Sequence, residues 1–140
     1  MKKFFAFSAV VLMLCAAMTT TSCSTEKSIV KAFEKKGYQM GTLTPQQQLA
    51  VAPVLSGFPA YSQSAIGYVV VDNAITFVYN LDNAAWDSYC YALTNAGFSN
   101  MGTGFIRADK GVGYTFNVAT SVAEVYKQPF RFVTFTAVPF

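Results

Sequence analysis

Side chains that commonly catalyse reactions or bind metals are scarce in this sequence of 140 residues. The chain contains no histidine, which removes the most common general base and the most common metal ligand. Cys90 is a candidate thiol, but its place on the apolar stripe of a predicted helix indicates a structural role and a raised pKa. The seven acidic residues are scattered, without the paired carboxylates of a glycosidase or the oxygen cluster of a calcium site. The sequence therefore predicts no catalytic residue, no metal site, no cofactor and no enzyme activity.

Aromatic side chains are the remaining candidates for binding, and they make up 16% of the chain. Most of them alternate within predicted strands, and Trp86 lies on the apolar stripe of a predicted helix, so we expect these rings in the core. Tyr61, Tyr79 and Tyr126 fall near predicted loops or strand ends instead. An exposed tyrosine can stack on a sugar ring or anchor a peptide. These three tyrosines are therefore the predicted ligand-binding residues.

The first 22 residues have the pattern of an export signal. Two lysines follow the initial methionine, and the run from Phe4 to Met18 is apolar. This run is shorter than the roughly 20 apolar residues that cross a bilayer, and the polar stretch TTTS follows it. The sequence therefore predicts a signal peptide over residues 1–22 and a single globular domain over residues 23–140.

Cys23 follows a small residue, Ser22, at the end of this signal. The stretch TTTSC resembles the lipobox of bacterial lipoproteins, in which the cysteine is acylated and becomes the mature N-terminus, although Thr20 stands where that pattern usually has leucine. Together with the lysine pair, it resembles the short lipoproteins of Bacteroides-type bacteria, while the globular part resembles no identified family. The resemblance implies an exported protein held to a lipid bilayer of the cell envelope through Cys23, with the outer membrane as the expected location. Ordinary cleavage at the same bond, or acylation of Cys15, remains open.

Charge excludes one class of partner. The chain has ten Lys or Arg and seven Asp or Glu, and Lys2 and Lys3 belong to the predicted signal. The remaining domain is nearly neutral, so it lacks the basic surface that binds nucleic acids. The sequence thus predicts a non-enzymatic envelope lipoprotein that acts as a binding or structural module. The alternative is a glycan or peptide binder that uses exposed tyrosines on a sheet face, and an envelope protein or a glycan would be the partner.

Short-range patterns indicate helices and antiparallel strands in mixed order. Helices are predicted over 26–36, from Pro45 after the capping box TPQQ, and over 82–96; strands are predicted over 38–43, 65–71, 74–80, 104–108, 112–118 and 130–138. Pro53 predicts a kink or an early end of the second helix. This order predicts an α+β fold, with a single antiparallel sheet of four to six strands and two or three helices packed on one face.

Two stretches echo each other, AFEKKGYQMGT at residues 32–42 and ALTNAGFSNMGT at residues 92–103. Each places a glycine and an aromatic residue at the end of a predicted helix. If Gly37 and Gly97 are the left-handed residues of Schellman motifs, an apolar contact should close each helix end. The expected contacts are Tyr38 with Phe33 and Phe98 with Leu93. A worn internal duplication of a helix and three strands is the alternative origin of the echo.

Overall fold

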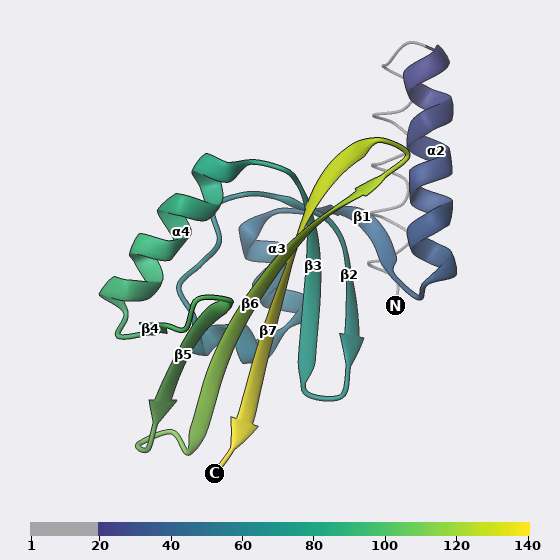
Figure 1. The fold of residues 1–140 in the computed structure, drawn as a ribbon. Helices are drawn as coiled ribbons and strands as arrows, with labels where there is room; N and C mark the ends of the chain where they lie inside the picture. Colours follow the sequence, from purple (N-terminus) through teal and green to yellow (C-terminus); the bar gives the residue numbers. More distant parts are fainter. Residues whose placement is uncertain (1–19) are drawn as a thin grey trace.

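The structure, a computed structural model, describes the backbone of residues 20–140 and the side chains of residues 26–140. Residues 1–19 of the predicted signal peptide lie outside the described residues. A seven-stranded antiparallel sheet runs through the fold in the order β1-β2-β3-β7-β6-β5-β4 (Figure 1). The strands are β1 Gln39–Leu43, β2 Ala65–Val71, β3 Ala74–Asn80, β4 Ser99–Asn100, β5 Gly104–Asp109, β6 Tyr114–Val125 and β7 Gln128–Pro139. The fold is therefore α+β with one antiparallel sheet, as the sequence predicts.

The sheet has seven strands, one more than the predicted maximum of six, and β4 is the strand that was not predicted. Its two residues pair with Ile106 and Phe105 of β5 at an outer edge of the sheet. A strand of this length is too short to show the alternation of apolar and polar residues that marks a strand in a sequence. The prediction of four to six strands is therefore wrong, because this edge strand carries no sequence signal.

The described helices are α2 Thr20–Lys35, α3 Pro45–Val51 and α4 Asn83–Asn95, with a 3-10 helix, η1, at Pro53–Gly57. Helix α3 begins at the predicted capping box. The backbone N–H of Gln47 donates to Thr44 Oγ1 at 3.3 Å, and the backbone N–H of Thr44 donates to Gln47 Oε1 at 2.9 Å. Pro53 follows the end of α3 and opens η1, because a proline has no N–H to continue the α-helix.

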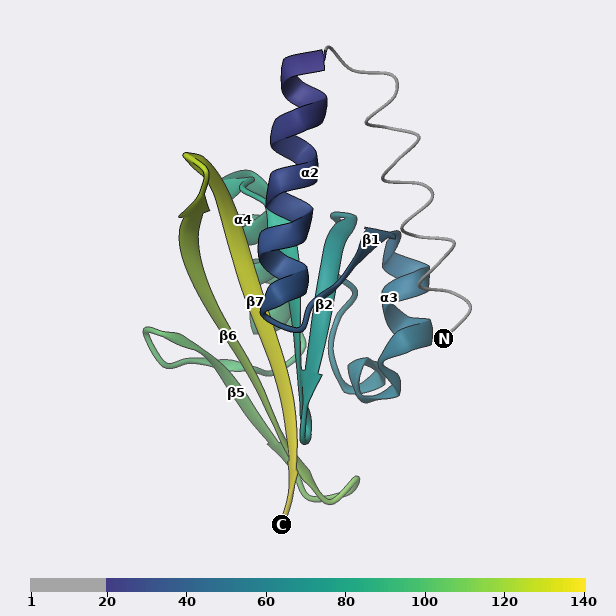
Figure 2. The same cartoon turned by 90° about the vertical axis from the view of Figure 1, so that its right-hand side faces the viewer.

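The helices cover both faces of the sheet, which corrects the prediction that they pack on one face. Helices α3 and α4 and the η1 turn lie on one face, over the larger core cluster around Phe77 and Phe135. Helix α2 lies on the other face (Figure 2). There Ile29 and Phe33 pack against Phe130. The reason lies in β7, a central strand whose alternate residues are large and apolar on both faces.

Helix α2 begins at Thr20, earlier than the predicted start at Glu26, so the backbone at Cys23 belongs to this helix. Lys27, Lys31 and Lys35 are spaced four residues apart on α2, and all three are exposed. Among the described residues, no helix is both long enough and apolar enough to cross a bilayer.

Both echoing stretches form Schellman motifs, as the sequence predicts. Gly37 and Gly97 have left-handed φ angles of 93° and 91°. The N–H after each glycine donates to the carbonyl five residues back, Tyr38 to Phe33 at 3.1 Å and Phe98 to Leu93 at 3.0 Å. The rings of Phe33 and Tyr38 meet edge to face at 5.4 Å. The two motifs lead into β1 and β4, which are the two outer strands of the sheet.

Replacing Gly37 or Gly97 with alanine should lower the free energy of unfolding by about 1–2 kcal/mol, the cost of a left-handed conformation for a residue with a Cβ. A Cβ at Gly37 would meet no atom within 4 Å, and one at Gly97 would lie 3.7 Å from Arg107 Cδ. Neither substitution causes a steric clash, so the loss of stability would come from the backbone conformation alone. Urea unfolding measures it. Gly111→Ala is the matched control because Gly111 has no left-handed φ, and an equal loss in all three variants would contradict this account.

The two ends of the sheet differ. The N-terminal half of α2 and the turn between β6 and β7 lie at one end, which we call the α2 end (Figures 1 and 2). The turns between β2 and β3 and between β5 and β6 lie at the other end together with Phe140 (Figures 1 and 2). We call this the hairpin end.

Candidate functional site

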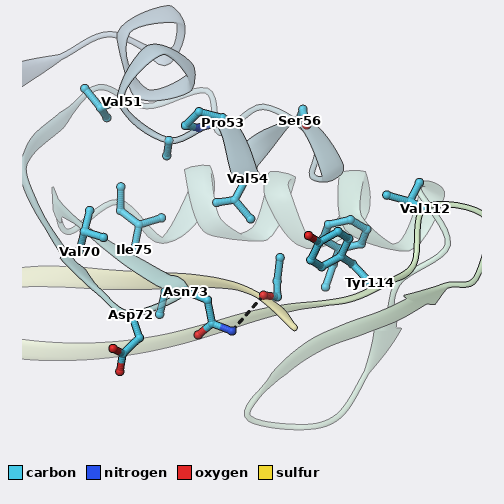
Figure 3. Close-up of a pocket in the computed structure, with 14 residues that line it drawn as sticks. Val51, Pro53, Val54, Ser56, Val70, Asp72, Asn73, Ile75, Val112 and Tyr114 are labelled. Atoms are coloured by element: carbon cyan, nitrogen blue, oxygen red, sulfur yellow. Dashed lines mark hydrogen bonds between the residues drawn. The ribbon is translucent and has the colours of Figure 1, made fainter. Parts of the chain in front are cut away.

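A surface pocket of about 520 Å³ opens at the hairpin end. It lies between the α3–η1 segment and the ends of β2, β3, β6 and β7 (Figure 3). Pockets that bind small molecules usually measure roughly 300–1,000 Å³ and are lined mainly by apolar side chains. Both the size and the lining of this pocket fall in that class, so it is the candidate binding site.

The floor of the pocket is part of the core. Ile75 of β3, Phe116 of β6 and Ala137 of β7 are buried, and Phe116 and Ala137 face each other across paired strands. The roof comes from the α3–η1 segment, where Pro53 breaks the helix and Val54 points from η1 toward the sheet (Figure 3). The break at Pro53 therefore shapes the pocket, because a continuous α-helix would not place Val54 over the sheet in this way.

Exposed apolar side chains form the rim. Val70, Val112 and Tyr114 line the pocket and are 55%, 60% and 39% exposed. Val71, Val138 and Phe140 are further exposed apolar side chains at the hairpin end. More than half of the exposed large apolar side chains in the described part of the chain therefore gather at this end. An exposed apolar surface of this kind is a candidate interaction site.

Few polar side chains line the pocket, and Asn73 among them makes a hydrogen bond within the fold. Asn73 donates its side-chain amide to the carbonyl of Ala137 at 3.0 Å and so ties the turn between β2 and β3 to β7 (Figure 3). Asp72, in the same turn, has a left-handed φ of 53° and supplies the carboxylate at the rim. A single carboxylate beside apolar side chains offers no acid–base pair. The arrangement therefore favours binding of an apolar group.

Arg107 fixes the elements behind the pocket. Its guanidinium donates to the carbonyl of Ala96 at 3.0 Å and to the carbonyl of Gly57 at 3.1 Å, which are at the ends of α4 and η1. It also lies over the rings of Phe98 and Phe116, 4.9 and 5.2 Å from their centroids. A positive charge at two helix C-termini is favourable because the carbonyls there carry partial negative charge. Arg107 thus holds η1, and with it Val54, in place over the sheet.

The structure buries two of the three predicted ligand-binding tyrosines. Tyr61 and Tyr79 are 4% and 0% exposed, and their rings lie 4.4 Å apart in the core. Burial raises the pKa of Tyr61 to about 12 and raises that of Tyr79 as well. The prediction that they are exposed is therefore wrong, because α4 covers the sheet face that contains Tyr79, and the Tyr61 ring enters the same core cluster from the loop before β2. Tyr126 is 63% exposed in the turn between β6 and β7, at the α2 end and remote from the pocket.

Cys90 and Trp86 lie where the sequence predicts, on the side of α4 that faces the sheet. Both are partly buried, and burial raises the pKa of the Cys90 thiol, with a further increase from the Asp87 carboxylate. The guanidinium of Arg131 lies 5.3 Å from the centre of the Trp86 ring. A thiol with a raised pKa is a poor nucleophile. These residues therefore act as packing groups.

No motif in the sequence marks the rim residues Val70, Val112 and Tyr114 as a binding site. A signal for Val70 was present, since the strand ends in three consecutive valines, and a regular half-buried strand would alternate with polar residues. Among the described residues, no group of three acidic or cysteine side chains is placed to hold a metal ion. Comparison with protein-family models, with curated proteins and with solved structures finds no match to this chain.

Proposed function

We propose that this protein is a non-enzymatic lipoprotein of the cell envelope whose domain binds a compact apolar group in the pocket at the hairpin end. The observation that carries the proposal is the pocket itself, about 520 Å³ in volume, with an apolar floor and an apolar exposed rim. Removing apolar surface from water contributes about 25 cal/mol per Å² toward the free energy of binding, against which the entropic cost of association is set. The rim valines supply such surface without any rearrangement of the core.

The position of the tether supports this proposal. Cys23 belongs to α2, whose N-terminal half lies at the α2 end, whereas the pocket opens at the hairpin end (Figures 1 and 2). A lipid on Cys23 would therefore attach the domain to the bilayer at the end opposite its pocket. This is the orientation that a binding module of the envelope needs in order to meet a partner.

The alternative of a glycan or peptide binder that uses exposed tyrosines has lost most of its basis, since Tyr61 and Tyr79 are buried. Tyr114 is the exposed tyrosine at the pocket, and it stands beside valines. A ring among aliphatic side chains fits an apolar group better than a sugar, whose hydroxyls would need polar partners.

The binding proposal is tested by titrating the purified protein with a neutral apolar fluorescent probe such as N-phenylnaphthylamine. We expect saturable binding of one probe per chain, because the pocket provides a site of defined size. Methyl resonances of Val54, Val70 and Ile75, which line the pocket, should shift during the same titration. A signal that rises without saturation, or shifts spread over the whole sheet, would count against the pocket.

The tether is tested by labelling cells with an alkyne fatty acid. Cys23→Ala should abolish the label, because the acylated cysteine would be gone. Cys90→Ala is the matched control and should keep the label, since the Cys90 thiol is partly buried within the domain. Equal labelling of the wild type and Cys23→Ala would contradict a lipid anchor at Cys23, and loss of label in a Cys15→Ala variant alone would assign the anchor to that residue.

A further inference from the structure

The strands β6 and β7 form a hairpin that projects beyond the rest of the sheet at the α2 end. Strand β5 accompanies β6 only as far as Ala119, and β3 accompanies β7 only from Phe130 onward. The two strands continue to pair with each other up to the contact between Val125 and Gln128. We propose that the turn of this hairpin, Tyr126–Lys127, is a second membrane contact that rests on an anionic bilayer surface beside the lipid anchor. The inference rests on the proposed tether at Cys23.

Packing fixes the hairpin against α2. Phe33 of α2 meets Phe130 of β7 edge to face, with ring centroids 5.4 Å apart. Val125, the last residue of β6, packs against the same cluster, which contains Ile29 and Phe33 of α2. Both views show the turn beside the N-terminal half of α2 (Figures 1 and 2). The turn therefore lies at a set position relative to the helix that contains Cys23.

The residues at the turn are suited to a bilayer surface. Tyr126 is 63% exposed, and the Lys127 side chain is exposed as well. Tyrosine is enriched at membrane–water interfaces, because its ring is apolar and its hydroxyl is polar, and lysine is attracted to anionic headgroups. Glu124 is close to the turn in sequence, and Glu26 is the first residue of α2 whose side chain the structure describes. The positive charges of the exposed Lys27 and Lys127 balance these two carboxylates.

The backbone of the turn strengthens this inference. Tyr126 and Lys127 have left-handed φ angles of 52° and 65°. Glycine and asparagine adopt this conformation at lower cost, so a tyrosine and a lysine are expensive choices for a tight turn. Residues held in such conformations often have a functional reason for their identity. A contact between the Tyr126 ring and the bilayer would supply that reason.

The consequence is a defined orientation of the domain. A lipid on Cys23 alone would let the domain pivot about one point. A second contact at the β6–β7 turn would hold the domain upright beside α2, with the hairpin end and its pocket directed away from the bilayer.

The test uses the mature protein isolated from cells, mixed with vesicles of phosphatidylethanolamine and phosphatidylglycerol in which some of the lipid is brominated near the headgroup. Tyr126→Trp places a fluorophore at the turn, and Val112→Trp places one at the hairpin end. Val112 is 60% exposed and so matches Tyr126 in exposure. Trp86, the single native tryptophan, gives the same background in both variants and in the wild type.

We expect brominated lipid to quench most of the emission that Tyr126→Trp adds, and to leave that of Val112→Trp unchanged. Replacing phosphatidylglycerol with phosphatidylcholine should weaken the quenching, because Lys127 then loses its anionic partners. Equal quenching in the two variants, or none in either while the protein floats with the vesicles, would overturn the second contact and leave the tether standing. A protein that does not float at all would overturn the tether and the contact together.

Discussion

Replacing Gln48 with leucine should lower the free energy of unfolding by about 3 kcal/mol, because two buried polar groups and one partly buried polar group would lose their hydrogen-bond partner. Gln48 is 3% exposed although it lies on α3 among polar neighbours. Its side-chain amide donates to the carbonyl of Leu43 at 3.1 Å and to the carbonyl of Gln63 at 2.9 Å. Its Oε1 accepts a hydrogen bond of 2.7 Å from the Tyr79 hydroxyl. Leucine fills a similar volume and replaces none of these bonds.

Gln46→Leu is the matched control for this prediction, since Gln46 is an exposed residue of the same helix. Its effect should stay within about 0.5 kcal/mol, as for most surface substitutions. The double variant Tyr79→Phe, Gln48→Leu should lose less stability than the sum of the two single variants. The Tyr79 hydroxyl, which loses its hydrogen-bond partner in Gln48→Leu, is absent from the double variant. Urea unfolding of the set measures these differences. A Gln48→Leu protein as stable as the wild type would show that this residue does not hold α3 to the sheet.

The local features of the fold could be predicted because short-range rules determine them. The capping box at Thr44 and Gln47 depends on side chains three residues apart. The Schellman motifs at Gly37 and Gly97 depend on a glycine and the residues beside it. Each rule involves residues that are close in sequence, so the amino-acid sequence alone is enough to predict these motifs.

Features that depend on tertiary packing could not be predicted in this way. Gln46, Gln47 and Gln48 are consecutive and chemically identical, yet the structure buries Gln48 alone of the three. Tyr61 and Tyr79 resemble loop and strand-end residues in the sequence, and only the position of α4 over the sheet places them in the core. The burial of such residues depends on segments that are distant in sequence.

The pocket belongs to the same class of features. Its lining comes from α3 and η1, from the turn between β2 and β3, and from the ends of β6 and β7. These segments span residues 51–137, and no pattern in the sequence relates them. The strand order, in which β3 pairs with β7, brings them together.

The most direct test of the proposed function compares Val70→Asp with Val71→Asp in the apolar-probe titration. Val70 lines the pocket, whereas Val71, the next residue of β2, does not line it. The two valines are 55% and 60% exposed, so the substitutions should cost similar stability. An aspartate at position 70 would place a charge against the bound apolar group, and desolvating a polar group costs about 1–3 kcal/mol.

We therefore expect Val70→Asp to weaken binding of the probe by about tenfold or more, since 1.4 kcal/mol corresponds to a factor of ten. Val71→Asp should bind the probe as the wild type does. Urea unfolding of both variants checks that the comparison concerns folded proteins. If the two variants bind the probe with equal affinity, the pocket at the hairpin end is not the binding site and the proposed function is wrong.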